Sequence, residues 1–257
     1  MNAAEIQHED DLLITQDVAR AVEEQELVAY YQPVVSLEDS SLASLEALVR
    51  WTMPDGTIVP AALFVPSLDR TDTIFGLDWF MAEDVCAFLQ QKAKGTSAFV
   101  PTCLNISGRH ASDPHFAQKL SATVGWHELS KDMLRIELSE ALLTSGDSAL
   151  TDLVTSLVDA GFTVTADNFA SNAAGLAALD ALGIKQVKVS ASLWKTCDKD
   201  ALAALMQEAA ARGISLGAEG IENEDELEAA RAAGFAYAQG YHLGAPTDGG
   251  SLISSWG

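Results

Sequence analysis

The chain has 257 residues, of which 48% are hydrophobic and 20% are charged, so it can bury a sizeable core and is not intrinsically disordered. Its 15 Lys and Arg residues stand against 37 Asp and Glu residues, which gives a formal net charge of −22. So acidic a chain is poorly suited to nucleic acid or anionic lipid, and we expect no DNA partner. Its apolar runs are too short to span a bilayer, so we expect no membrane insertion.

Cysteine usage indicates the redox compartment. Cys86, Cys103 and Cys197 lie far apart, match no paired metal-ligand spacing and cannot form a complete set of disulfides. This pattern is typical of a reducing environment, so we expect a cytoplasmic protein.

The start of the chain predicts a helix and then a hairpin. Residues 1–25 are expected to form a tail with a lead-in helix, because helical spacing of apolar residues runs from Thr15 to Leu27. Two strand-like stretches follow at 28–35 and 42–51, and the polar turn at 38–41 between them has hairpin length. The first strand is therefore predicted to pair antiparallel with the second.

From residue 98 onward, β-branched stretches alternate with Ala/Leu-rich helical patterns, as in βαβ units. Strands are predicted at 98–106, 134–138, 162–166, 186–189, 214–218 and 236–239. Helices are predicted at 147–160, 198–212 and 222–233, each followed by a glycine, as helix carboxyl ends often are. Since no Pro/Gly/Ser-rich linker interrupts this order, we expect one α/β barrel at residues 26–248 and a tail at 249–257.

Polar residues lie at or near the ends of most predicted strands. The carboxyl ends of parallel barrel strands share one rim, so these side chains should meet there. They are Glu46, Asn105, Glu137, Glu140, Asp167, Lys188, Glu219 and Gln239. Any one of them alone would more simply be a solvated strand-end residue. Together their oxygens suit a hard divalent cation, and clustered carboxylates without a cation must raise their pKa values.

Six short motifs follow one another in order along roughly residues 26–248. They are Tyr31-Gln32-Pro33, Glu46-Ala47-Leu48 with Arg50-Trp51 after it, Asn105-Ile106-Ser107, Glu137-Leu138-Ser139-Glu140, Ala218-Glu219-Gly220-Ile221-Glu222 and Gln239-Gly240-Tyr241. As an ordered set they resemble the motifs of the EAL domain family, whose members bind and hydrolyse the bacterial second messenger cyclic di-GMP.

The resemblance implies a TIM-like (β/α) barrel of the EAL type with an antiparallel first strand. It also implies cleavage of cyclic di-GMP to pGpG by a water activated between two Mg²⁺ or Mn²⁺ ions. The implied metal ligands are Glu46, Asn105, Glu137 and Asp167. Lys188 would hold the attacking water or a phosphate oxygen, Glu219 would be a metal ligand or base, and Arg50 would contact a phosphate. Supporting residues for substrate binding would be Gln239, Glu222 and Glu140.

Three departures from the family pattern fall on this chemistry. Asn168 stands where the family has a second Asp, and Ser190 stands at the third position of the family's Lys-Ile-Asp. Neither side chain is charged, so we expect one Mg²⁺ or Mn²⁺ ion to bind and the second ion to bind weakly or not at all. Ala170 and Asn172 replace two glycines, which we expect to restrict a loop that could use positive φ, more at Ala170.

We therefore interpret the chain as a degenerate EAL domain, a regulatory or receptor domain that binds cyclic di-GMP with little or no hydrolysis. Two other functions stay open. One is an active metal-dependent phosphodiesterase, and the other is a protein-interaction module that has lost the nucleotide through its remodelled segment 168–175. This loop mediates dimer contacts in many family members, so a homodimer or another protein is an expected partner beside cyclic di-GMP.

Overall fold

The computed structural model describes residues 17–24, 26–93 and 100–251. The strands are β1 (Leu27–Ser36), β2 (Leu42–Thr52), β3 (Ile58–Pro60), β4 (Thr102–Asn105), β5 (Leu134–Ser139), β6 (Thr163–Phe169), β7 (Gln186–Val189), β8 (Ser215–Ala218), β9 (Tyr237–Ala238) and β10 (Thr247–Asp248). The helices are α2 (Val65–Leu68), α3 (Thr73–Ala93), α4 (Phe116–Trp126), α5 (Glu140–Leu143), α6 (Ser148–Asp159), α7 (Ala173–Ala181), α8 (Ala191–Trp194), α9 (Lys199–Arg212) and α10 (Glu224–Ala233). Short 3₁₀ helices are η1 (Ala61–Leu63), η2 (Gly108–Ser112) and η3 (Lys131–Met133).

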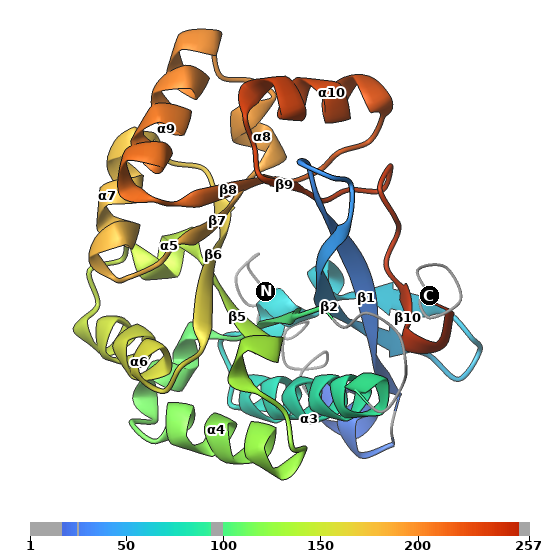
Figure 1. Cartoon of the computed structure of the whole chain (residues 1–257). Coiled ribbons are helices and arrows are strands. Elements are labelled where there is room, and N and C mark those ends of the chain that lie inside the picture. Colours follow the sequence, from blue (N-terminus) through green and yellow to red (C-terminus); the bar gives the residue numbers. More distant parts are fainter. Residues whose placement is uncertain (1–16, 25, 94–99, 252–257) are drawn as a thin grey trace, which may run out of the picture.

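The barrel closes because β1 pairs with a strand on each of its sides (Figure 1). It runs antiparallel to β2, with Tyr31 opposite Ala47, and antiparallel to β9, with Val35 opposite Ala238. From β2 through β4, β5, β6, β7 and β8 to β9, every neighbouring pair is parallel. The predicted α/β TIM-like barrel with an antiparallel first strand is confirmed.

Successive side chains along each strand point alternately towards the surrounding helices and into the barrel interior. In β5, Leu134, Ile136 and Leu138 are buried in the hydrophobic core, whereas Glu137 lines the interior. The surrounding layer is formed by α3, α4, α6, α7, α9 and α10 (Figure 1). The apolar side chains of the strands are buried against these helices, so polar side chains can line the barrel interior.

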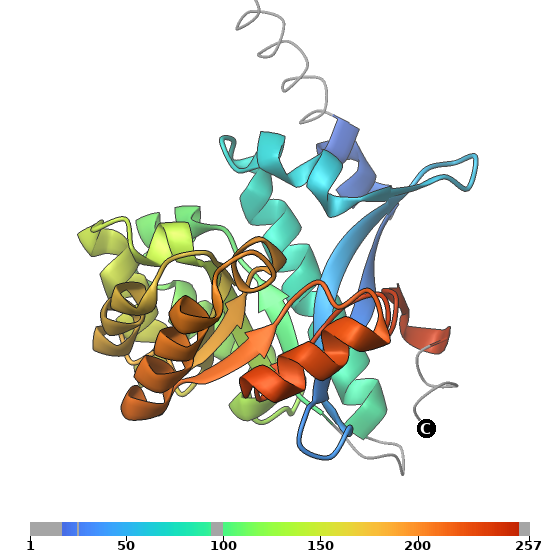
Figure 2. The same ribbon diagram turned by 90° about the horizontal axis from the view of Figure 1, so that it is seen from above.

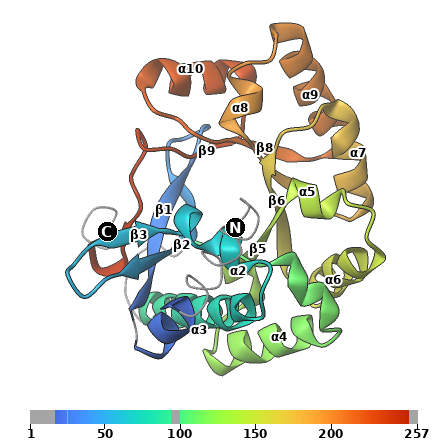
Figure 3. The same cartoon turned by 180° about the vertical axis from the view of Figure 1, so that it is seen from behind.

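One end of the barrel carries extra short elements. The helical residues 17–23, η1 and α2 gather there, and the β2–β3 hairpin projects from it (Figure 2). Seen from behind, α2 lies in front of the barrel opening, near β2 (Figure 3). These elements therefore border the rim at which the predicted site residues should meet.

Helix ends follow the sequence signals closely. Asp147, Asp198 and Asn223 are the amino-terminal caps of α6, α9 and α10, each accepting a hydrogen bond from a backbone N–H of the first turn. Gly213 and Gly234 end α9 and α10 with φ of 63° and 93°, the left-handed conformation that glycine adopts without strain. Predicted helices 147–160, 198–212 and 222–233 thus lie within one or two residues of their observed bounds.

Other predicted bounds differ more. The lead-in helix is observed at 17–23 and ends before Leu27, which opens β1, while residues 15, 16 and 25 lie outside the described part. The strand predicted at 98–106 is observed as β4 from Thr102, with 98 and 99 outside the described part. β6 continues past Ala166 to Phe169. Of the predicted tail, residues 249–251 are described and are helical. Within the described ranges no helix is long and apolar enough to cross a membrane.

We expect Gly240→Ala to lower the free energy of unfolding by roughly 1–3 kcal/mol or more. An added Cβ at Gly240 would lie 2.1 Å from the backbone oxygen and 2.2 Å from the backbone nitrogen of Ile221. Gly76→Ala in α3 is the matched control, because nothing lies within 4 Å of its added Cβ. Alanine there should stabilise the helix by about 0.5–1 kcal/mol. Thermal unfolding compares the two, and similar midpoints would contradict the expectation.

Candidate functional site

Strand register brings the predicted site residues to one rim. In the parallel pairs, Asn105 of β4 lies opposite Glu137 of β5, and Ser139 of β5 lies opposite Asp167 of β6. Glu46 of β2 lies opposite Cys103 of β4, so its side chain reaches the same level as Asn105. Side chains that are distant in sequence therefore converge because the strands are parallel and in register, as predicted.

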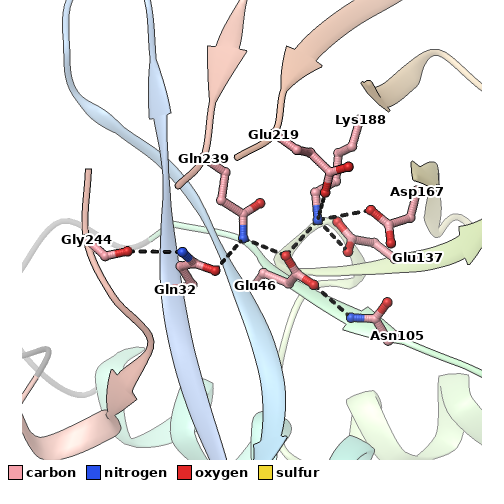
Figure 4. A network of polar contacts seen from close by, with 9 residues as sticks. All are labelled: Gln32, Glu46, Asn105, Glu137, Asp167, Lys188, Glu219, Gln239 and Gly244. Atoms are coloured by element: carbon pink, nitrogen blue, oxygen red, sulfur yellow. Dashed lines mark hydrogen bonds and ion pairs between the residues drawn. The ribbon is translucent and has the colours of Figure 1, made fainter. Parts of the chain in front are cut away.

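An ammonium group lies at the centre of this rim (Figure 4). Nζ of Lys188 lies 2.7 Å from Oε2 of Glu46 and 3.0 Å from Oε2 of Glu137. It also lies 3.3 Å from Oδ1 of Asp167 and 3.8 Å from Oε1 of Glu219. We call these five residues the ion network. It joins β2, β5, β6 and the end of β8 to Lys188 on β7.

Hydrogen bonds extend the ion network through Glu46. Its Oε1 accepts from Nδ2 of Asn105 at 3.0 Å, and its Oε2 accepts from Nε2 of Gln239 at 2.6 Å. Nε2 of Gln239 also donates to Oε1 of Gln32 at 3.1 Å, and Gln32 in turn donates to the backbone oxygen of Gly244 (Figure 4). Both oxygens of Glu46 are thus bonded, which offsets much of the cost of burying the carboxylate.

Burial and charge set the protonation of the ion network. Burial raises the pKa of Glu137 and of Glu219 to about 8. Burial opposes ionisation of Glu46 as well, but Lys188 and the hydrogen bonds to its oxygens outweigh it and lower the pKa of Glu46. Burial also disfavours the charged form of Lys188, yet its carboxylate neighbours raise the pKa of Lys188 well above its usual value. One ammonium does not neutralise four carboxylates, and the raised pKa values of Glu137 and Glu219 favour the protonated form of these two groups near neutral pH.

The donor set fits a hard divalent cation in its chemistry. Glu46, Glu137 and Asp167 offer carboxylate oxygens, and Asn105 offers an amide oxygen. Oε1 of Glu137 is buried and accepts no hydrogen bond from the described residues. The carboxylates are, however, gathered around Nζ of Lys188, and no described group of three or more His, Cys, Asp or Glu side chains is arranged as a metal site. A bound ion would therefore compete with an ammonium and with protons.

Glu140 holds a loop and lies outside the ion network. Its Oε2 accepts the backbone N–H of Ala170 at 2.7 Å and that of Ser171 at 3.2 Å. The side chain is buried, and these two amides belong to the loop that follows β6. Glu140 thus supports the rim through the backbone of this loop.

The remodelled loop places its left-handed residue at Asn168. Asn168 has φ of 54°, and the pairing of β6 with β7 shifts register between Ala166 and Phe169. Asparagine tolerates this conformation better than most residues. Ala170 is not among the described residues with positive φ, and Asn172 caps α7 with φ of −86°. The loop therefore takes its positive φ at Asn168 and not at Ala170 or Asn172, and the restriction expected at these two residues stays a prediction.

Three further predicted residues lie apart from the ion network. The hydroxyl of Ser190 is 2.9 Å from that of Ser192. Arg50 lies on β2, four residues beyond Glu46, with its guanidinium 5.9 Å from the ring of Tyr30, and burial lowers its pKa. Glu222 is exposed, and among the described residues its side chain makes no hydrogen bond or ion pair with the network.

A cavity of about 550 Å³ opens beside the ion network. One wall carries Glu46, Asn105, Asp167 and Asn168. Another part of the lining is apolar and includes Ala61, Ala62, Val65 and Pro66 from η1 and α2. The apolar residues suit an apolar part of a ligand, whereas the carboxylates of Glu46 and Asp167 would repel an anion unless a cation lies between them.

Comparison with known proteins decides the family. A family model described as EAL domain matches residues 15–246. The chain belongs to the EAL domain family. It is similar to the probable cyclic di-GMP phosphodiesterase PdeG of Escherichia coli K12, with 25% identity over 232 residues, 88% of this chain and 46% of PdeG. It is also similar to the bifunctional diguanylate cyclase/cyclic di-GMP phosphodiesterase MucR of Pseudomonas aeruginosa, with 23% identity over 252 residues, 96% of this chain and 37% of MucR. The chain spans less than half the length of these relatives.

Solved EAL structures share the fold. The PaMucR phosphodiesterase in complex with c-di-GMP gives a TM-score of 0.84 at 22% identity, covering 93% of this chain and 99% of that chain. The FimX EAL domain from Pseudomonas aeruginosa bound to c-di-GMP gives a TM-score of 0.80 at 22% identity, covering 93% of this chain and 96% of that chain. At this level of identity the likeness concerns the fold.

Two residues of this EAL domain were assigned no role from the sequence. Gln32 lies opposite Glu46 in the hairpin and bonds Gln239, and its place in an opening motif was the available signal. Nε1 of Trp194 donates to the backbone oxygen of Glu219 at 2.8 Å. That contact joins α8 to the end of β8 across 25 residues, and nothing in the sequence indicates it.

We expect Lys188→Met to lower the free energy of unfolding by roughly 3–5 kcal/mol at pH 8, because the buried carboxylates lose a cation. Without Lys188 the folded-state pKa values of Glu137 and Glu219 lie further above their unfolded values near 4.5, so stability should rise again as the pH falls from 8 towards 6. Added Mn²⁺ should restore stability in the same way. Thermal unfolding with and without Mn²⁺ measures both effects.

The control is Lys119→Met, which breaks the exposed pair of Lys119 with Asp113. Exposed pairs contribute little, so this variant should unfold like the wild type at every pH and metal concentration. A Lys188→Met protein as stable as the wild type at pH 8 without metal would contradict the role of Lys188 as the neutralising cation.

Proposed function

We propose that this EAL domain is a regulatory or receptor domain that binds cyclic di-GMP and hydrolyses it little or not at all. The observation that carries the proposal is the convergence of the oxygen donors at the rim, while Asn168 and Ser190 are uncharged where the resemblance to the family implies acids. The ligand is supported by the names of PdeG and MucR and by the c-di-GMP complexes of PaMucR and FimX.

The cavity beside the ion network is the proposed nucleotide site. Its polar wall would face the phosphates, and its apolar wall from η1 and α2 would face a base. Arg50 lies on the same side of β2 as Glu46 and would contact a phosphate. Gln239 would support binding by orienting Glu46.

One Mg²⁺ or Mn²⁺ ion is proposed to bind at Glu46, Asn105, Glu137 and Asp167. When bound, such an ion neutralises phosphate charge and lowers the pKa of a coordinated water. Glu137 would release its proton to become a ligand, since ligating carboxylates are ionised. A second ion would find fewer charged ligands, because Asn168 is an exposed amide and the hydroxyl of Ser190 is engaged with Ser192.

A slow phosphodiesterase is the second candidate, and the convergence of Lys188 and Glu219 on the proposed ligands favours it. Lys188 would hold a phosphate oxygen or the attacking water. Glu219, whose pKa burial raises to about 8, is mostly protonated at neutral pH and would take a proton from that water once it is ionised, so this activity should rise as the pH increases towards 8. The slow phosphodiesterase and the receptor would both bind cyclic di-GMP, and they differ in whether the bound nucleotide is hydrolysed.

Calorimetry with cyclic di-GMP and Ca²⁺ tests binding, and we expect micromolar or tighter affinity. Arg50→Ala should weaken it at least tenfold through a lost charged hydrogen bond, whereas Arg231→Ala, which lies at the opposite end of the barrel beside Ser40, should not. Absence of heat at high concentration would contradict the proposal and favour a protein-interaction module.

Product chromatography after long incubation with Mn²⁺ should show no more than traces of pGpG, and rapid formation would favour the phosphodiesterase.

We expect Asn168→Asp combined with Ser190→Asp to raise Mn²⁺ affinity and pGpG formation together, by at least tenfold each, because two carboxylates join the metal shell. Asn172→Asp is the control, since it adds a carboxylate to the same loop at the cap of α7. Calorimetry and chromatography measure the two effects. If the double variant behaves like the wild type, charge loss does not explain the low turnover.

A further inference from the structure

A buried His–Asp pair lies beside the ion network, between α3 and the loop after β4. Nε2 of His110 is 3.0 Å from Oδ2 of Asp78, and the two side chains are 2% and 9% exposed. Burial raises the pKa of Asp78, and its hydrogen bonds from His110 and Ser107 oppose that shift. Burying an acid costs free energy unless its oxygens are hydrogen-bonded. The hydrogen bonds of Asp78 therefore show which groups it holds in place.

Aromatic rings fix the orientation of His110. Its ring stacks on Phe116 with centroids 4.0 Å apart. Phe75 and Trp79 meet it in T-shaped geometry at 5.0 Å and 6.2 Å. Both come from α3, the helix that also carries Asp78. His110 is thereby held with Nε2 towards the carboxylate.

Asp78 reaches the rim through the backbone of the β4 loop. Its Oδ2 accepts the N–H of Ser107 at 2.8 Å and lies 3.0 Å from Nε2 of His110, which donates to it in the tautomer that carries the hydrogen on Nε2. The neighbouring N–H of Ile106 donates to the backbone oxygen of Glu137 at 3.2 Å. The loop is therefore fixed on one side to α3 and on the other side to β5. Asn105 immediately precedes Ile106 and Ser107, whose two backbone N–H groups are held in this way.

We propose that Asp78, oriented by His110, is a positioning residue that fixes Asn105 at the rim by anchoring the backbone N–H of Ser107. Asn105 is exposed and its side chain donates to Glu46, so its placement depends on that hydrogen bond and on the loop backbone rather than on packing around its side chain. Asp78 and Asn105 also border the same cavity. The effect on metal binding rests on the proposed function, in which Asn105 is a ligand, whereas the anchoring does not.

Hydrogen exchange of residues 104–108 in the full chain, followed by mass spectrometry, tests the anchor without metal or nucleotide. Asp78→Ala should speed exchange there by about tenfold, the equivalent of one lost hydrogen bond. Asp78→Asn keeps a side-chain oxygen that can accept the Ser107 N–H and should exchange within about threefold of the wild type. Unchanged exchange in Asp78→Ala would overturn the proposal, as would equal effects of the two variants.

Two substitutions of His110 separate hydrogen bonding from packing. His110→Phe keeps a ring against Phe116 but has no donor for Asp78, so residues 104–108 should exchange faster. His110→Gln keeps an N–H donor at a similar reach and should restore slow exchange. If His110→Phe exchanges like the wild type, His110 does not orient Asp78.

Mn²⁺ calorimetry gives the second readout. Loss of an outer-shell partner typically costs roughly 10–100-fold in metal affinity, and we expect this range for Asp78→Ala and His110→Phe. Leu157→Ala, a fully buried position near the carboxyl end of α6, controls for general destabilisation and should leave Mn²⁺ affinity and exchange at 104–108 unchanged. Equal losses in Leu157→Ala would overturn the specific role of Asp78. If the wild type binds no Mn²⁺, the proposed metal site fails, and the exchange data alone decide the anchor.

Discussion

The ammonium of Lys188 among four carboxylates is the interaction on which the rim of this EAL domain depends. Closing the barrel brings Glu46, Glu137, Asp167 and Glu219 together from separate strands or strand ends, which would be strongly repulsive without a cation. Lys188 relieves part of this repulsion, and protons relieve more, since burial raises the pKa of Glu137 and Glu219 to about 8. The same shortage of positive charge makes the rim receptive to a divalent cation.

Buried groups hold the loops that carry the rim residues. Glu140 binds two amides of the loop after β6, and Asp78 binds one amide of the loop after β4. Trp194 acts in a related way on the backbone oxygen of Glu219. Because these contacts reach the backbone, the paths of the loops do not depend on the rim side chains alone.

Much of the rim could be predicted from residues at strand ends, but their partners could not. Glu46, Asn105, Glu137, Asp167, Lys188, Glu219 and Gln239 converge as predicted. Glu140 was expected to support substrate binding, and the contacts observed for its carboxylate are with a loop. The bulge that gives Asn168 a positive φ has no separate sequence signal, because its conformation is set by the pairing of β6 with β7.

The sequence by itself determined the barrel, its antiparallel first strand and the family, since hydrophobic periodicity, turn residues and the order of the motifs can all be recognised along the chain. Only the tertiary structure decided which polar groups touch. Lys188 meets Glu46 across 142 residues and Asp78 meets His110 across 32, and such distances follow from strand register and helix packing. Protonation was likewise decided by burial, which depends on every element packed around a group.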